Sequence, residues 1–95
     1  MKTQVTFRHV ESSPALHDAA VESIKKFERF FNGITAANAE FISDNGKTVE
    51  FTVQVQGNTL VSKESSEDFT KSINLASDKM IRQIKKWKTK TFKTV

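Results

Sequence analysis

Lysine and arginine side chains recur at regular intervals near the C-terminal end of this 95-residue chain. Lys79, Arg82, Lys86 and Lys90 follow one another at steps of three, four and four residues, which places them along one side of an α-helix. A regular row of cations suits a regular row of anions, and the phosphate backbone of a nucleic acid is the commonest such array. The spacing therefore favours an anionic partner, with nucleic acid as the first candidate.

Hydrophobic residues in the same stretch predict the helix that carries this row. They recur at steps of three and four residues, which is typical of one buried helical face. These residues are Phe69, Ile73, Ala76, Met80, Ile84 and Trp87. We therefore expect an amphipathic helix over 69–90, with the cations beside its buried face.

Charge is distributed unevenly along the chain. The sequence has 15 Lys and Arg residues against 11 Asp and Glu residues, a net charge of +4. No acidic residue follows Asp78, and the seven cations beyond it leave a net charge of −3 on the rest of the chain. Cations near a helix C-terminus also complement the helix dipole, but that effect fades within the last turn, and Lys79 and Arg82 lie too far back for it.

Length and composition predict a single domain over residues 1–95, which is large enough for one hydrophobic core. Cysteine is absent, so the sequence offers neither disulfides nor a cysteine-based metal site. No apolar run has the length of a signal peptide or the roughly 20 residues of a membrane span. These features predict a cytoplasmic protein without a membrane partner.

Alternation and helical periodicity divide the chain into six elements. A strand over 3–7 precedes a helix that Ser13 caps and Pro14 starts. Asn32-Gly33 ends this helix, with Gly33 available as a left-handed residue after the last turn.

Strands are also predicted over 37–42, 48–56 and 59–64. Asn45-Gly46 predicts a tight hairpin turn, because both residues tolerate positive φ, and Gly57-Asn58 predicts a second turn. Ser65 or Ser66 is expected to cap the last helix.

The predicted order β-α-β-β-β-α specifies an α+β fold. The first two strands flank a helix and can lie parallel through a right-handed crossover, whereas the last three form an antiparallel meander. In the third strand, polar residues such as Thr52 and Gln54 alternate with hydrophobic ones, which indicates a sheet covered on one face. The hydrophobic residues are Val49, Phe51, Val53 and Val55. We expect a two-layer sandwich, in which a four-stranded sheet carries two helices on one face.

Both helices then turn their polar sides outward together. Three cations of the first helix would join the row on the second helix and form one broad cationic surface with it. The predicted nucleic-acid-binding residues are Lys25, Lys26, Arg29, Lys79, Arg82, Lys85, Lys86 and Lys90.

Two segments of the chain resemble the ribosome hibernation promoting factors, a family that includes the ribosome-associated inhibitor called protein Y. The first segment comprises Phe7-Arg-His-Val-Glu11, Pro14-Ala-Leu16 and Ile24 to Phe31, and the second runs from Ser66 to Lys88. The residues of the second segment that match the family pattern are Ile73, Ala76, Asp78, Lys79, Arg82, Gln83 and Lys86. The resemblance covers nearly the whole chain and agrees in element order.

The resemblance implies a function. Proteins of this family bind the small ribosomal subunit in the channel that holds mRNA and tRNA, and they contact ribosomal RNA through basic residues of both helices. Translation then stops under stress or in stationary phase while the ribosome is preserved. The resemblance further implies a short form without the C-terminal dimerisation domain of long members, and a chain that is monomeric when free. It leaves open whether ribosome dimers form.

Other chemistry-bearing residues give weaker signals. His9 and His17 lack cysteine or paired-carboxylate partners, so no metal site is expected. Asp44-Asn45-Gly46 resembles the start of a calcium loop, but a hairpin turn explains it fully. No nucleophile, base or Gly-rich phosphate loop forms a catalytic constellation, so we predict no enzyme, no cofactor and no small-molecule substrate. Trp87 is in phase with the buried face, whereas Phe92 lies outside that pattern and could stack on a base.

Two other classes of protein stay open at this point. A double-stranded RNA-binding module that is not specific to ribosomes has a similar α-β-β-β-α order. Such a module uses a basic helix start, whereas the cations here gather at the helix end. The second class is a small enzyme or protein-interaction module of two-layer form, for which the sequence offers no motif.

Overall fold

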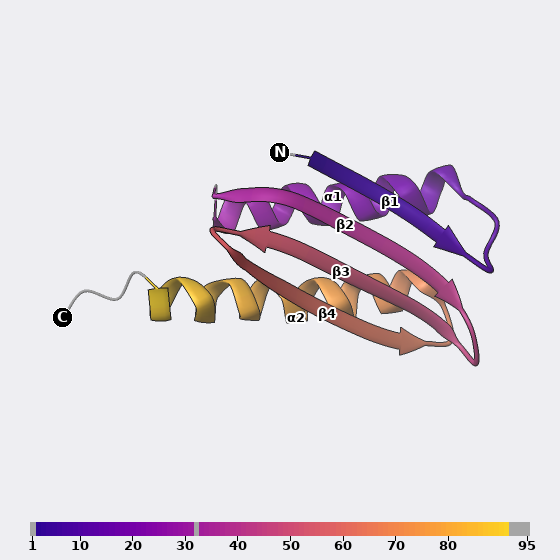
Figure 1. Cartoon of the computed structure of the whole chain (residues 1–95). Helices are drawn as coiled ribbons and strands as arrows, with labels where there is room; N and C mark the ends of the chain where they lie inside the picture. Colours follow the sequence, from indigo (N-terminus) through magenta and orange to yellow (C-terminus); the bar gives the residue numbers. More distant parts are fainter. Residues whose placement is uncertain (1, 32, 92–95) are drawn as a thin grey trace.

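The computed structural model describes residues 2–31 and 33–91, except for the side chains of residues 90 and 91. Its elements are shown in Figure 1 and follow the order predicted from the sequence. They are β1 (Lys2–Arg8), α1 (Pro14–Phe30), β2 (Ile34–Ser43), β3 (Lys47–Val55), β4 (Asn58–Ser66) and α2 (Phe69–Thr91). The predicted α+β order, β-α-β-β-β-α, is therefore confirmed.

The four strands form a sheet in the order β1-β2-β3-β4. β1 lies parallel to β2, and the other two pairs are antiparallel, as the crossover and the meander predicted. Both helices lie on the same face of this sheet and run in the same direction, so the other face is open (Figure 1). The expected two-layer sandwich is confirmed, and the C-terminal ends of the two helices lie at the same end of the molecule.

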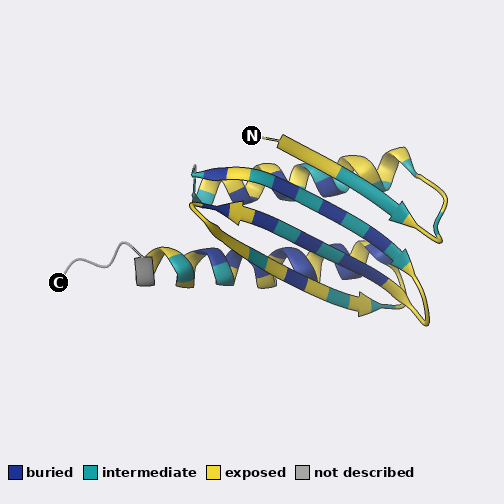
Figure 2. Ribbon diagram, in the orientation of Figure 1, coloured by how far each residue is buried: buried dark blue, intermediate teal, exposed yellow. Residues whose placement is uncertain are grey.

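The core lies between the sheet and the helix layer, and burial alternates along the strands (Figure 2). Thr52 is half-buried and Gln54 is exposed on the open face, whereas the inward residues of β3 are at most 1% exposed. These inward residues are Val49, Phe51, Val53 and Val55. The ring of Phe51 meets Phe27 of α1 edge-on, with 5.1 Å between the ring centres. Such aromatic contacts fix how each helix is rotated on the sheet, and so which of its residues face outward.

Two tight turns connect the antiparallel strands. Asn45 and Gly46 have φ angles of 58° and 140°, the positive values that their sequence predicted. The second turn lies one residue earlier than predicted, because Gln56 and Gly57 have positive φ (26° and 80°) while Asn58 already belongs to β4. Val55 pairs with Asn58, so a two-residue turn closes this hairpin, and positive φ at both central positions is typical of the type I′ form of such turns.

The start of α1 is as predicted, but its end is not. The hydroxyl of Ser13 accepts a hydrogen bond of 3.3 Å from the backbone N–H of Leu16, and Pro14 occupies the first turn. Contrary to the prediction, Gly33 does not directly follow the last turn, because α1 ends earlier, with the extended residue Phe31 at φ −161°. Gly33 is needed for space, since a Cβ at this position would collide with the ring of Phe31.

The predicted cap of α2 is also wrong. Asp68, and neither Ser65 nor Ser66, accepts a hydrogen bond of 2.8 Å from the backbone N–H of Lys71. The strand β4 is longer than predicted and includes both serines. The Ser66 hydroxyl lies 2.7 Å from the Ser72 hydroxyl instead, which fixes the start of α2 against the end of β4.

Candidate nucleic-acid interface

Two cations of α1 face the groove between the helices. The buried face of α1 contains Ala20, Ile24 and Phe27, which leaves the residues between them on the outer side. Lys26 and Arg29 are exposed, and both line a groove of about 500 Å³ between α1 and α2. The same helical spacing that builds the core therefore positions these two charges.

Three of the predicted cations lie on the outer side of α2. The buried face of this helix extends from Phe69 to Ile84, as the hydrophobic spacing predicted. Arg82, Lys85 and Lys86 are consequently exposed. Within the part of the chain that the structure describes, none of the three forms an ion pair. Their charges are therefore not neutralised by the fold and are available to a ligand.

Lysines of α2 also join the C-terminal ends of the two helices. Lys88 Nζ donates a hydrogen bond of 2.7 Å to the carbonyl of Phe30, the last residue of α1. Lys85 Nζ lies 5.0 Å from the centre of the Phe30 ring. Because the C-terminus of a helix carries partial negative charge, both lysines stabilise the end of α1. Arg29 and Lys88 line the same shallow hollow, so cations from both helices gather at this end.

Lys88 was not among the residues predicted from the sequence. It follows the buried residues Ile81 and Ile84 at steps of seven and four, and it therefore lies on the side of α2 that faces α1. This spacing could have identified Lys88 from the sequence, but the prediction was based on the row from Lys79 to Lys90, which lies on another side of the helix. The observed surface thus extends from α2 onto the end of α1.

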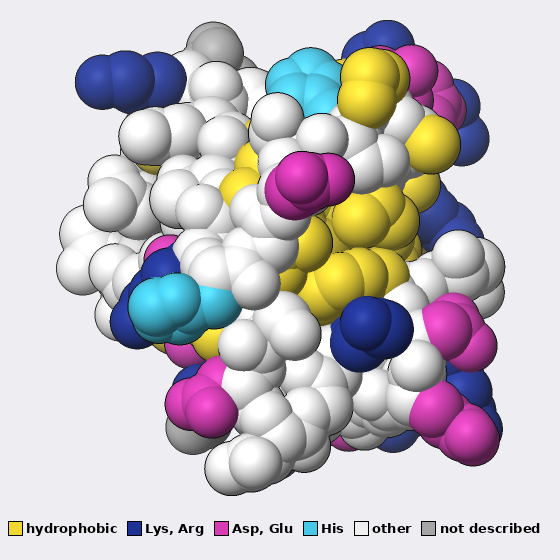
Figure 3. All heavy atoms as spheres, turned by 90° about the vertical axis from the view of Figure 1, so that its right-hand side faces the viewer, with side chains coloured by type: hydrophobic (Ala, Val, Ile, Leu, Met, Phe, Trp, Pro, Cys, Tyr) yellow, Lys and Arg dark blue, Asp and Glu magenta, His cyan; other side chains and the backbone are white. Residues whose placement is uncertain are grey.

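The opposite end of the molecule has mixed charge. Figure 3 views the end where α1 and α2 begin, and there both acidic and basic side chains surround an area of hydrophobic side chains. Asp18, near the start of α1, and Asp68, at the cap of α2, belong to this end. This end therefore lacks the run of exposed cations that the C-terminal halves of the two helices carry.

Two predicted residues, Lys79 and Lys25, are paired with carboxylates and do not line the groove between the helices. Lys79 Nζ lies 3.2 Å from the Glu64 carboxylate of β4, on the side of α2 that faces away from α1. Lys25 Nζ lies 3.8 Å from the Glu22 carboxylate, and its side chain borders a different groove, between α1 and β1. The fold therefore pairs these two cations with carboxylates, and their contact with RNA stays a prediction.

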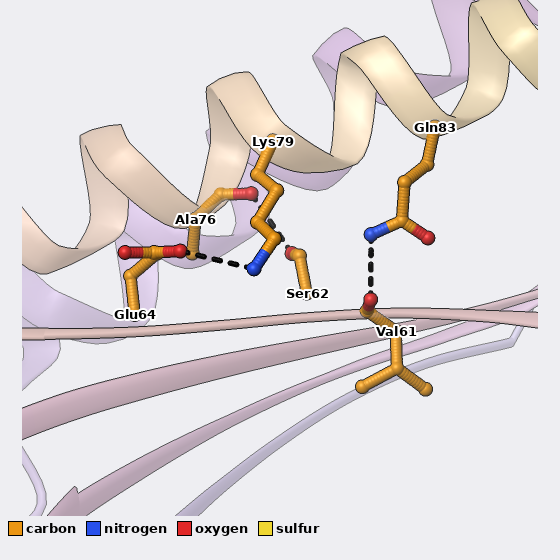
Figure 4. A network of polar contacts seen from close by, with 6 residues as sticks. All are labelled: Val61, Ser62, Glu64, Ala76, Lys79 and Gln83. Carbon is orange, nitrogen blue, oxygen red and sulfur yellow. Dashed lines mark hydrogen bonds and ion pairs between the residues drawn. The ribbon is translucent and has the colours of Figure 1, made fainter.

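Lys79 belongs to a set of polar contacts that hold α2 on β4 (Figure 4). Ser62 Oγ donates a hydrogen bond of 2.8 Å to the carbonyl of Ala76, and Gln83 Nε2 donates one of 2.6 Å to the carbonyl of Val61. The contact of Gln83 satisfies a carbonyl of an edge strand that would otherwise be open to other chains. This side of α2 thus has a structural role, whereas Arg82 forms no ion pair within the part of the chain that the structure describes.

Three further residues from the sequence analysis have separate outcomes. Lys90 lies within α2, but its side chain is outside the described part of the structure, so its role stays a prediction. Phe92 also lies outside the described residues. Trp87 is partly buried, and its ring lies edge-on to Phe31 with 4.9 Å between the ring centres. This packing supports the interpretation of Trp87 as a core residue.

The open face of the sheet carries charges of both signs. Arg8 donates hydrogen bonds of 3.2 and 2.9 Å to the two oxygens of Glu40. This hydrogen bonding, together with the carboxylate charge, raises the pKa of the Arg8 guanidinium above its ordinary value. Lys63 lies opposite Glu50 on the neighbouring strand. No uninterrupted row of cations like that of α2 is present among the described residues of this face.

The histidines do not form a ligand cluster. His17 Nδ1 lies 3.5 Å from the Asp18 carboxylate, and both side chains are exposed. Among residues 2–31 and 33–91, no three His, Asp or Glu side chains are grouped so that they could hold a metal ion. Neither of the described helices is long and apolar enough to span a membrane.

Comparison with known proteins identifies the family. Residues 3–91 match the family described as Sigma 54 modulation protein / S30EA ribosomal protein. The chain belongs to this family, which includes the ribosome hibernation promoting factors that its sequence resembles. The family consists of ribosome-binding proteins rather than enzymes, in agreement with the sequence analysis.

Two relatives illustrate the relationship. The ribosome hibernation promotion factor of Bacillus subtilis is 35% identical over 94 residues, which cover 95% of this chain and 50% of that protein. The ribosome hibernation promoting factor of Pseudomonas putida is 33% identical over 93 residues, which cover 95% of this chain and 89% of that protein. The chain thus spans half the length of the Bacillus relative and most of the length of the Pseudomonas relative.

Solved structures support the fold. A ribosomal subunit interface protein from Coxiella burnetii superposes with a TM-score of 0.86 at 26% identity, covering 94% of this chain and 99% of that one. The N-terminal domain of protein Y from Thermus thermophilus superposes with a TM-score of 0.82 at 20% identity, covering 92% and 99%. The second similarity concerns the fold alone.

Proposed function

We propose that this protein is a ribosome hibernation factor, a single ribosome-binding domain that acts in the cytoplasm under stress or in stationary phase. It binds the small ribosomal subunit through ribosomal RNA, in the channel that holds mRNA and tRNA, and inhibits translation. The observation that carries the proposal is the set of exposed cations on the C-terminal halves of α1 and α2, in a chain of this family. We call this set the helix-layer cations: Lys26, Arg29, Arg82, Lys85, Lys86 and Lys88.

The proposed binding is mainly electrostatic. Each phosphate that a cation neutralises releases counterions, and this release supplies a large share of the affinity for nucleic acids. Both helices rest on a shared core, so their cations are held in fixed rows before RNA arrives, which lowers the entropy lost on binding. Arg29 and Arg82 add planar donor groups that can grip a phosphate with two hydrogen bonds.

Inhibition follows from occupancy of the channel. A folded domain in the channel of the small subunit excludes mRNA and tRNA by volume, without any chemical reaction. The domain needs no catalytic group, cofactor or small-molecule substrate for this. Because free protein and free ribosome both survive, the inhibition is reversible when the domain dissociates.

Sedimentation through a density gradient tests the proposal. We expect purified protein to migrate with small subunits and whole ribosomes but not with isolated large subunits. Loading the small subunit with mRNA and tRNA beforehand should reduce the bound amount, and an excess of isolated duplex RNA should not. Migration with large subunits alone, or equal competition by duplex RNA, would contradict a channel site. The latter outcome would favour a general RNA-binding module.

A further inference from the structure

The groove between α1 and α2 has two chemically different walls. The wall formed by α1 carries the cations Lys26 and Arg29. It also carries the carboxylate of Glu22, which is paired with Lys25 at 3.8 Å. The wall formed by α2 carries Thr70, Asn74 and Asp78, which follow one another at steps of four residues. The unpaired charges of the α1 wall are therefore positive and suit phosphates, whereas the α2 wall offers neutral hydrogen-bonding groups and a carboxylate without an ion-pair partner among the described residues.

Asp78 does not suit a surface that binds only phosphates. It is the one acidic residue of α2, which otherwise carries seven cations. Its side chain is exposed, and within the described part of the chain it forms neither an ion pair nor a hydrogen bond. A carboxylate beside a phosphate is repelled, so Asp78 either weakens RNA binding or meets a different group of the RNA.

The bases of RNA offer such a group. The Watson–Crick edge of guanine presents two adjacent N–H donors, N1–H and the N2 amino group, and a carboxylate has two oxygens that accept them side by side. Asn74 lies one helical turn before Asp78, and its amide N–H₂ can donate to the guanine O6 acceptor beside those donors. Unpaired bases in loops expose this edge, which is how most sequence-specific RNA recognition works.

The shape of the groove allows a base to enter. Ile73 and Ser77 form its floor and are 4% and 5% exposed, while Ala19 and Ser23 on α1 are small. Its volume of about 500 Å³ lies within the range of roughly 300–1,000 Å³ that is typical of small-ligand sites. We infer that this groove holds one unpaired guanine of the bound RNA, with Asp78 and Asn74 on its base edge and Lys26 and Arg29 on the flanking phosphates. The inference rests on the proposed binding to ribosomal RNA.

Substitution of Asp78 tests the inference by the sign of the effect. Asp78→Ala should weaken binding to small subunits by about tenfold and leave the salt dependence unchanged, because a base contact of this kind is lost and no cation is. Asp78→Asn keeps one acceptor oxygen, so its affinity for small subunits should lie between that of the wild type and that of Asp78→Ala. If Asp78 only repelled phosphates, both changes would strengthen binding instead, and that result or an unchanged affinity would overturn the inference.

A matched control removes one negative charge elsewhere on the helix layer. Glu28→Gln changes an exposed carboxylate of α1 that does not line this groove, and it should leave affinity unchanged or slightly higher. Ser23→Leu keeps every charge but fills the groove, and it should weaken binding as Asp78→Ala does. Thermal unfolding of each variant checks that the fold persists.

A second measurement separates this inference from the proposed function. Short unstructured uridine oligonucleotides that contain one guanine, one inosine or one adenine are titrated with the wild-type protein and with Asp78→Ala. The wild type should prefer guanine over inosine, which lacks the N2 amino group, and over adenine, and Asp78→Ala should lose this preference. Preference for guanine without ribosome binding would contradict the proposed function alone. Ribosome binding without any preference for guanine would contradict the base site alone.

Discussion

The two outer faces of this molecule are both exposed and polar, but they differ in how their charges are arranged. On the open face of the sheet, Arg8 is bound to Glu40, and Lys63 lies opposite Glu50. On the helix layer, α2 carries seven cations and one carboxylate, and those of its outer side have no ion-pair partner among the described residues. This difference in unpaired charge, rather than a difference in polarity, is the reason why we propose the helix layer as the surface for a polyanion.

The stability of the fold alone does not explain why the helix-layer cations lie so close together. Arg82 and Lys86 are four residues apart on α2, and like charges at that spacing destabilise a helix by about 0.2–0.5 kcal/mol per pair. On the open face of the sheet, opposite charges face each other across neighbouring strands, and such pairs stabilise a sheet by about 0.2–1 kcal/mol each. The sheet face therefore has the arrangement that favours folding, whereas the helix layer has an arrangement that a polyanionic ligand would stabilise.

The largest expected effect comes from reversing charges on the helix layer. Arg82→Glu together with Lys86→Glu should abolish binding to the small subunit, with a loss of at least about 100-fold, because each change removes a cation and places an anion against phosphate. Both side chains are exposed, so core packing is unaffected. Co-sedimentation with subunits and inhibition of translation in an extract measure the effect.

The matched control reverses the same number of charges on the sheet face. Lys2→Glu together with Lys63→Glu makes the same change in net charge, and both residues are exposed on strands. We expect less than a twofold change in binding, and thermal unfolding of both double variants confirms that they fold. If the helix-layer variant still pelleted with ribosomes and the sheet-face variant did not, the ribosome-binding surface would have to be the open face of the sheet.

A smaller effect is expected in the salt dependence. The slope of log affinity against log salt concentration should be about −3 or steeper, since each neutralised phosphate contributes roughly 0.7–0.9. Lys86→Ala should make the slope less steep by about one such contribution, and Lys63→Ala should leave it unchanged. Binding measured at several salt concentrations gives these slopes, and an affinity that does not change with salt would contradict an electrostatic interface.

The smallest effects should mark the border of the interface on α2. Lys88→Ala should weaken binding a few-fold, because Lys88 lies beside Arg29 at the end of α1. Lys79→Ala should change binding by less than twofold and lower the free energy of unfolding by about 0–1 kcal/mol, since this exposed lysine is paired with Glu64. Equilibrium binding and chemical denaturation measure the two quantities. If Lys79→Ala weakened binding more than Lys88→Ala did, the interface would have to include the side of α2 that faces β4.

The sequence predicted the features that depend on local patterns. Alternation in β3 predicted its buried residues, and the Ser13 cap of α1 was correct to the residue, because burial on one face and capping both leave a local signature. The cap of α2 was missed because β4 extends through Ser66 to contact α2, which is a tertiary effect. The need for space at Gly33 was missed for a similar reason, since a glycine at this position makes room for the Phe31 ring.

The candidate interface was predictable only in part. The cations of α1 and α2 could be identified from their spacing, but the spacing does not show which side of α2 faces a strand. Lys79 was therefore grouped with Arg82, although Glu64 of β4 pairs with it. Lys88 was left out, although it contacts the end of α1. Both differences arise from the packing of α2 between α1 and β4, which no single helix encodes.

Photocrosslinking compares the two faces most directly. Among the described residues, each face has one exposed large hydrophobic residue. Leu75 on α2 is 41% exposed, and Val61 on β4 is 44% exposed, with its side chain directed away from α2 (Figure 4). A photoreactive phenylalanine analogue at either position samples its own face with similar access. We predict that the analogue at position 75 crosslinks to the RNA of the small subunit and that the analogue at position 61 does not. Crosslinking from position 61 alone would contradict the assignment of the helix layer as the ribosome-binding surface.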